Sequence, residues 1–220
     1  MSALTQLLAR LRLVLEDGST ARYSADLLEQ AVRLALDELS VSLPQVVSLV
    51  ATFTESSNQQ PLPQAVGLRV LIEVYYPWTG NAGPAQGMIG CGWQDGVARL
   101  CFARGLVAQA GEQARIVYVA LHTLQGLDEA TQTSLSPDLM ELLVKGASAQ
   151  AALLRWGVLS ELYGARNEAA ASLEQWGALG LADFRAQVQQ RSHDLPAGLP
   201  LLPQTGWEDC PTAPGYGLKG

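Results

Sequence analysis

The sequence is poor in the residues that usually carry out catalysis or bind polyanions. Among its 220 residues there are two histidines, His122 and His193, and three cysteines, Cys91, Cys101 and Cys210. No spacing of His, Cys and Asp resembles a metal site. Only two of the 14 basic residues are lysines, and 21 acidic residues give a net charge of −7. This balance argues against a protein that binds nucleic acid by neutralising phosphates.

Long hydrophobic runs are lacking as well. No stretch approaches the 18 or so apolar residues that a transmembrane helix needs, and the amphipathic N-terminus does not resemble a signal peptide. A two-residue turn at positions 95–96 would pair Cys91 with Leu100, so Cys91 and Cys101 would lie diagonally and a disulfide between them is disfavoured. We therefore expect reduced thiols and folding in the cytoplasm.

Catalytic motifs are also missing. Cys91 could act as a nucleophile beside a histidine, but nothing in the local sequence supports such a pair. The glycines of segment 83–92 lead into a strand-like run without a Gly-Lys-Ser/Thr motif, so they do not predict a phosphate loop. The aromatic run YYPW over 75–78 could stack bases, yet few basic residues surround it and packing is favoured. We predict no enzyme activity, no cofactor and no metal.

Helical periodicity is present towards both ends of the chain. Apolar residues recur at helical spacing in four segments: 3–16, 25–41, 137–163 and 167–190. Ser24 and Ser136 precede the second and third segments and are expected to cap them, and Asp26 places a negative charge in a first turn, where the helix dipole favours it. The last segment has an apolar face of Leu173, Trp176, Leu181, Phe184 and Val188.

The middle of the chain changes to β-rich runs. These cover 45–54, 66–76, 97–103 and 114–124 and are bounded by Gly, Pro and polar clusters, which predicts a small, mostly antiparallel sheet or barrel. Segments 54–64 and 77–90 are expected to be loops, the second either a hairpin tip or a segment on the rim of an assembly. The predicted fold class is therefore α+β: a helical bundle with an inserted small antiparallel β-region and an extended C-terminal tail.

Four parts follow from these patterns. Residues 1–44 form the N-terminal helix pair of the bundle, residues 45–124 a β-rich lobe, and residues 125–193 the C-terminal helices that complete the bundle. Residues 194–220 contain five prolines and no periodicity, which is typical of an extended Pro/Gly-rich tail.

The second helical segment has a wider apolar arc than one core requires. Two interpretations remain open: the helix is sandwiched inside its own domain, or it also packs on a neighbouring subunit. Small residues of the third helix would let another backbone approach. In the second interpretation the subunit interface includes Leu28, Val32, Leu36, Gly146 and Gly157.

The order of these parts forms a longer pattern. A short helix and the turn EDGSTARYS precede the helix ADLLEQAVRLALDELS, and a β-region with the strand ARIVYVALHTLQGLD follows. The Ala-rich helix LSPDLMELLVKGASAQAALLRWGVLSEL and a last amphipathic helix complete it. Over about residues 4–191 this pattern resembles the head–tail adaptor (connector) proteins of tailed bacteriophages.

The resemblance implies a structural virion protein without catalytic residues. Such a protein would form a ring of twelve subunits in the neck, assembled in the host cytoplasm, beneath the portal protein. The ring would extend the DNA channel, let DNA pass without specific binding, touch no membrane, and receive the tail or a stopper protein. The tail at 194–220 resembles adaptor tails that reach the portal, with Leu199, Leu201, Leu202 and Trp207 as its docking residues.

Two other classes of function remain open. One is a host or prophage helical protein-binding module whose proline-rich tail recruits a partner. The other is a hydrolase or similar enzyme with a β insertion, which would require His122 to lie beside a cysteine. Electron microscopy for rings separates the adaptor from the binding module.

Overall fold

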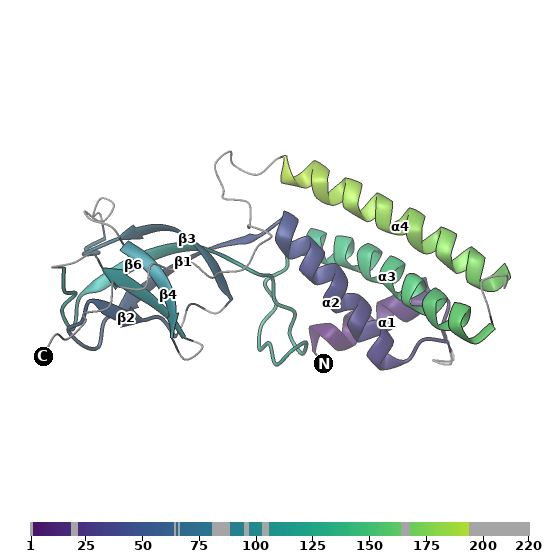
Figure 1. Ribbon diagram of the computed structural model, residues 1–220, viewed down its shortest axis with the longest axis horizontal. Coiled ribbons are helices and arrows are strands. Elements are labelled where there is room, and N and C mark those ends of the chain that lie inside the picture. Colours follow the sequence, from purple (N-terminus) through teal and green to yellow (C-terminus); the bar gives the residue numbers. More distant parts are fainter. Residues whose placement is uncertain are drawn as a thin grey trace, which may run out of the picture. The chain divides into compact units, whose positions relative to one another are not determined.

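A computed structural model describes residues 2–18, 22–63, 65, 67–80, 89–94, 97–102, 106–163 and 168–193 of the chain. The chain divides into two compact units (Figure 1). The helical unit consists of the described parts of 1–45 and 121–198, and the β unit of the described parts of 46–120. The α+β fold class is confirmed, whereas the tail predicted at 194–220 lies outside the described residues.

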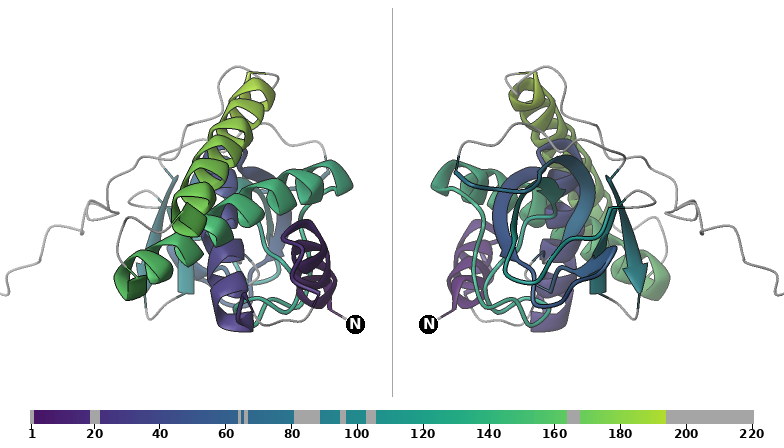
Figure 2. Two further views of the ribbon diagram at one scale, coloured as in Figure 1. Left: turned by 90° about the vertical axis from the view of Figure 1, so that its right-hand side faces the viewer. Right: turned by 90° about the vertical axis from the view of Figure 1, so that its left-hand side faces the viewer.

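Four helices build the helical unit. They are α1 (Ala3–Val14), α2 (Ala25–Ser42), α3 (Pro137–Tyr163) and α4 (Glu168–Ser192). α3 is central: it packs against α1, α2 and α4, as both views in Figure 2 also show. Each helix begins and ends within a few residues of its predicted bounds, because strong periodicity and clear caps specify helices well.

Side-chain caps start the helices where the sequence predicts. The Ser24 hydroxyl accepts a hydrogen bond from the Leu27 N–H at 3.2 Å, and the Ser136 hydroxyl accepts one from the Leu139 N–H at 3.4 Å. Each bond satisfies a backbone donor that has no partner within its helix.

The core of the helical unit has two layers, one on each side of α3. Buried residues of α1 and α2 pack against Leu143 and Ala147 on one side, and residues of α4 pack against Leu142 and Ala149 on the other. This arrangement explains why α3 is apolar nearly all round.

The wide apolar arc of α2 belongs to this core. Leu28 and Val32 are fully buried and Leu36 is 6% exposed within the single chain, so these side chains are not available to a neighbouring subunit. Of the two interpretations, the helix sandwiched inside its own domain accounts for their burial, and the interface assignment of these three residues is corrected. The periodicity showed that the arc is apolar, but it could not show what covers it.

Glycines of α3 and α4 let these two helices of the same chain pack closely. A Cβ atom on Gly146 would lie 2.9 Å from the Phe184 ring, and one on Gly177 would lie 2.8 Å from Leu153. The contact at Gly146 is therefore made within the chain, which corrects its assignment to a subunit interface. A Cβ atom on Gly157 would have no neighbour within 4 Å, so that position is open.

Two three-stranded antiparallel sheets form the β unit. One has the strand order β1 (Gln45–Thr52), β6 (Gln113–Ala120), β3 (Leu68–Tyr75), and the other has β2 (Gln59–Pro61), β5 (Val97–Phe102), β4 (Ile89–Gln94). β5 pairs with β4 so that Cys91 lies opposite Leu100, as the expected two-residue turn requires. Residues 95–96 themselves, and residues 81–88 of the predicted 77–90 loop, lie outside the described residues.

The sequence did not predict β2. β2 lies in the polar segment 54–64, where no apolar alternation marks a strand; Gln60 is nevertheless buried, and its amide donates to the Glu55 carbonyl at 2.8 Å. Pro61 is tolerated because β2 is an edge strand. The expected turn at 95–96 predicts β4 only as the partner of β5, because the glycines of β4 hide any alternating apolar pattern of its own.

Candidate functional site

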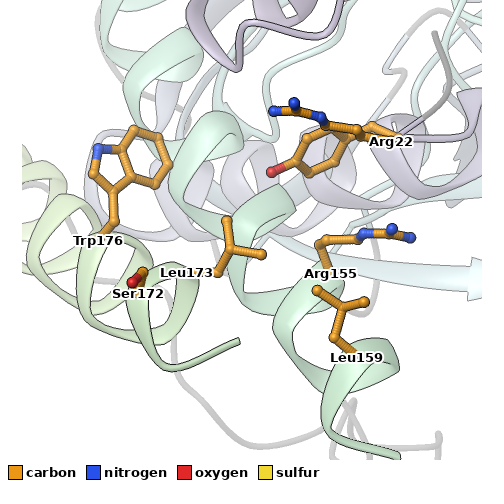
Figure 3. A pocket seen from close by; sticks show the side chains of 7 residues that line it. Arg22, Arg155, Leu159, Ser172, Leu173 and Trp176 are labelled. Atoms are coloured by element: carbon orange, nitrogen blue, oxygen red, sulfur yellow. The ribbon is translucent and has the colours of Figure 1, made fainter. Parts of the chain in front are cut away.

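A pocket of about 570 Å³ opens in the helical unit, where the start of α2 meets the C-terminal half of α3 and the N-terminal half of α4. Figure 3 shows arginines on one side of the pocket and residues of α4 on the other. Its lining residues are Arg22, Tyr23, Arg155, Leu159, Ser172, Leu173 and Trp176.

A buried carboxylate holds the segment that brings Arg22 and Tyr23 to the pocket. Asp17 is almost fully buried after α1, and its two oxygens accept hydrogen bonds from the backbone N–H groups of Arg22 and Tyr23, each at 3.1 Å. The adjacent Ser24 cap then starts α2. Asp17 is thus a positioning residue, which sequence reasoning missed because its partners are backbone groups five and six residues away.

The charged side chains that line the pocket are two arginines, Arg22 and Arg155. Neither Arg22 nor Arg155 makes an ion pair in the described part of the chain, whereas Arg10, Arg33 and Arg185 each pair with an acid. Burial raises the pKa of the Tyr23 phenol above its ordinary value, and the nearby Asp17 carboxylate adds to that rise, whereas Arg155 and Arg22 oppose it. Because a raised pKa keeps the phenol neutral near pH 7, it does not offset the two guanidinium charges.

The opposite wall is apolar and open to solvent. Leu173 is half-buried there and the Trp176 indole is 45% exposed, whereas the half-buried Leu159 lies beside Arg155 on α3 (Figure 3). The sequence placed Trp176 on the core face of the last helix, but only Leu181, Phe184 and Val188 are buried there. Two arginines in a pocket that also has an aromatic and aliphatic wall favour a ligand that carries carboxylates beside a large apolar group.

His122 has a structural role in the helical unit. Its Nε2–H donates to the Leu43 carbonyl at 2.8 Å, and its Nδ1 lies 3.0 Å from the Ser134 hydroxyl. The hydroxyl of Ser40 accepts the backbone N–H of His122 at 3.1 Å. Both ring nitrogens are thus engaged by groups other than a thiol, and the ring links the end of α2 to the segment that follows β6.

The burial of His122 predicts a pH-dependent stability. Burial lowers the pKa of His122, and the Leu43 carbonyl only partly opposes this. As the pH falls below about 6.5, the unfolded chain binds a proton that the folded chain does not, so the free energy of unfolding decreases. We expect His122→Gln to flatten this loss between about pH 7 and pH 5. Urea unfolding followed by circular dichroism at several pH values measures the free energy of unfolding. His193→Gln is the control, because His193 is exposed. If the free energy of unfolding changed equally with pH in the unchanged protein and both variants, the prediction would be contradicted.

The aromatic run at 75–78 is engaged within the β unit. The Arg115 guanidinium lies over the rings of Tyr75 and Trp78, at 5.6 and 5.3 Å from their centroids, and Tyr76 packs against Phe53 and Phe102. These contacts agree with the packing interpretation of the run.

The described residues hold no cluster of three or more His, Cys, Asp or Glu suited to a metal ion. Within the same ranges, no helix combines the length and hydropathy needed to cross a bilayer. The predicted docking residues Leu199, Leu201, Leu202 and Trp207 lie outside the described residues.

Comparisons with known proteins identify no family model and no curated protein that matches this chain. Among solved structures, a chain of the "Neck of empty GTA particle computed with C6 symmetry" is similar, with 15% sequence identity. The similarity covers 76% of this chain and 87% of that chain, and its TM-score of 0.32 denotes a weak likeness.

Proposed function

We propose that this chain is a structural protein of the neck of a tailed phage or phage-like particle. It forms a ring that joins the portal to the tail and extends the DNA channel. The pattern over residues 4–191, which resembles head–tail adaptors, supports this proposal. Twelve subunits, a tail or stopper protein as partner, and portal docking through the C-terminal tail are the finer parts of the same proposal.

The observation that favours a ring is apolar surface at two separate places on the helical unit. Leu13 of α1 is 78% exposed, with the half-exposed Val14 beside it, and Leu179 of α4 is 64% exposed, one turn from Trp176. In Figure 2 (left), α1 and the N-terminal half of α4 lie on different sides of α2 and α3. A cyclic ring needs two different, complementary surfaces on each subunit. We call them the α1 surface (Leu13 and Val14) and the α4 surface (Leu179).

Charge substitutions on these two surfaces test the proposal. We expect Leu13→Glu and Leu179→Glu each to abolish rings seen by electron microscopy while leaving circular dichroism unchanged, because both side chains are exposed in the single chain. An equimolar mixture of the two variants still offers one intact α1 surface and one intact α4 surface, so its mass by light scattering should stop at a dimer.

Val107→Glu provides the matched control, since Val107 is a half-exposed valine in the β unit. It should assemble as the unchanged protein does. Rings of normal mass from either helical variant would show that these surfaces do not join subunits.

A further inference from the structure

The pocket between α2, α3 and α4 is a charged site without a partner in the described part of the chain. Arg22 and Arg155 approach it from one side, and Trp176 and Leu173 form its opposite wall (Figure 3). Unpaired guanidinium groups beside an exposed indole provide both charge recognition and apolar contact. The pocket therefore fits a peptide in which acidic residues adjoin a large aromatic side chain.

The chain carries such a peptide after its last helix. Residues 194–220 contain three acidic residues, and two of them, Glu208 and Asp209, directly follow Trp207. The third, Asp194, lies next to the end of α4 and has no aromatic neighbour. An aromatic side chain and acidic side chains thus adjoin at one place in this segment.

The segment is long enough to reach the pocket of its own chain. α4 ends at Ser192, and the 16 residues from Trp176 to Ser192 span about 24 Å at about 1.5 Å per residue. The 15 residues from Ser192 to Trp207 can extend to about 50 Å at about 3.3 Å per residue. Because the two are joined in one chain, the segment is present at a high effective concentration.

We propose that this pocket binds residues 207–209 of its own chain. Trp207 lies against Trp176 and Leu173, and the carboxylates of Glu208 and Asp209 pair with Arg22 and Arg155. The proposal does not rest on the neck function, and it assigns Trp207 to the pocket rather than to the portal. Leu199, Leu201 and Leu202 remain candidates for portal docking.

Cys210 makes the proposal testable in the full-length chain, because it directly follows Asp209. Ser172 lines the pocket and is exposed, so Ser172→Cys places a thiol there with little change in size. Oxidised glutathione supplies the oxidant for a disulfide between the two thiols. We expect a cross-linked monomer on non-reducing gels, with the 172–210 bond identified by peptide mass mapping.

Two comparisons make the outcome decisive. Ala178→Cys, an exposed position on another face of α4, should cross-link to Cys210 at least tenfold more slowly. Glu208→Gln with Asp209→Asn should slow the 172–210 cross-link about tenfold, since each of the two solvent-accessible ion pairs contributes about a factor of three. Equal rates at positions 172 and 178, no effect of the neutral variants, or cross-linked dimers in place of monomers would each overturn the proposal.

Discussion

Phe184→Ala is expected to destabilise the helical unit by about 3–5 kcal/mol, the cost of removing a buried aromatic side chain. The Phe184 ring is fully buried and fills the space above Gly146, where α4 crosses α3. Gly146 has no side chain that could fill the gap left by the ring. Urea unfolding followed by circular dichroism measures the loss.

Two further variants test whether the lost packing against Gly146 causes the destabilisation by Phe184→Ala. Leu179→Ala on the same helix removes an exposed side chain and should change the free energy of unfolding by no more than about 0.5 kcal/mol. Gly146→Ala should destabilise the unchanged protein, because its Cβ would meet three ring atoms at 2.9–3.0 Å, yet stabilise the Phe184→Ala variant by up to about 1 kcal/mol. Additive effects of the two substitutions would contradict this packing account.

Leu36→Asp is expected to unfold the helical unit or to destabilise it by about 4–5 kcal/mol. Leu36 is 6% exposed in the core between α2 and α3, so the substitution removes apolar contacts and buries a carboxyl group. A protein is stable by only about 5–15 kcal/mol, so one such change is a large part of the total. The helical circular dichroism signal and the yield of soluble protein measure the effect, and both should fall.

The control lies two residues earlier in the same helix. Leu34 is 36% exposed, and Leu34→Asp introduces the same charge at the rim of the core. It should cost about 1 kcal/mol or less, mainly through the lower helix propensity of aspartate. If Leu36→Asp were as stable as Leu34→Asp, α2 would not bury the face that the structure assigns to its core.

The helices could be predicted from the sequence because their signals are local. Ser24, Asp26 and Ser136 mark helix starts within a few residues of the apolar pattern that they cap. β2 could not be predicted, since a short polar strand is formed by its partner β5 rather than by its own residues. The glycine-rich β4 was indicated only by the turn at 95–96, which pairs it with β5. The burial of Leu36 was ambiguous for a related reason: periodicity reveals an apolar face but not its neighbour.

The pocket could not be predicted because its residues come from three separate segments. Arg22, Arg155 and Trp176 are each unremarkable in the sequence, and only the packing of α2, α3 and α4 brings them to one cavity. The exposed Leu13 and Leu179 were likewise hidden among apolar residues that are buried.

The bonds around His122 also bear on how this chain could be re-engineered or could diversify. Leu43 precedes the β unit and His122 follows it, and a 2.8 Å hydrogen bond joins them. The two ends of the inserted segment are therefore held side by side by the helical unit alone. Residues 46–120 could therefore be exchanged for a short turn or a different module without redesign of the helical core. Members of a lineage built on this scaffold could then differ greatly in the inserted part and still keep the same four helices.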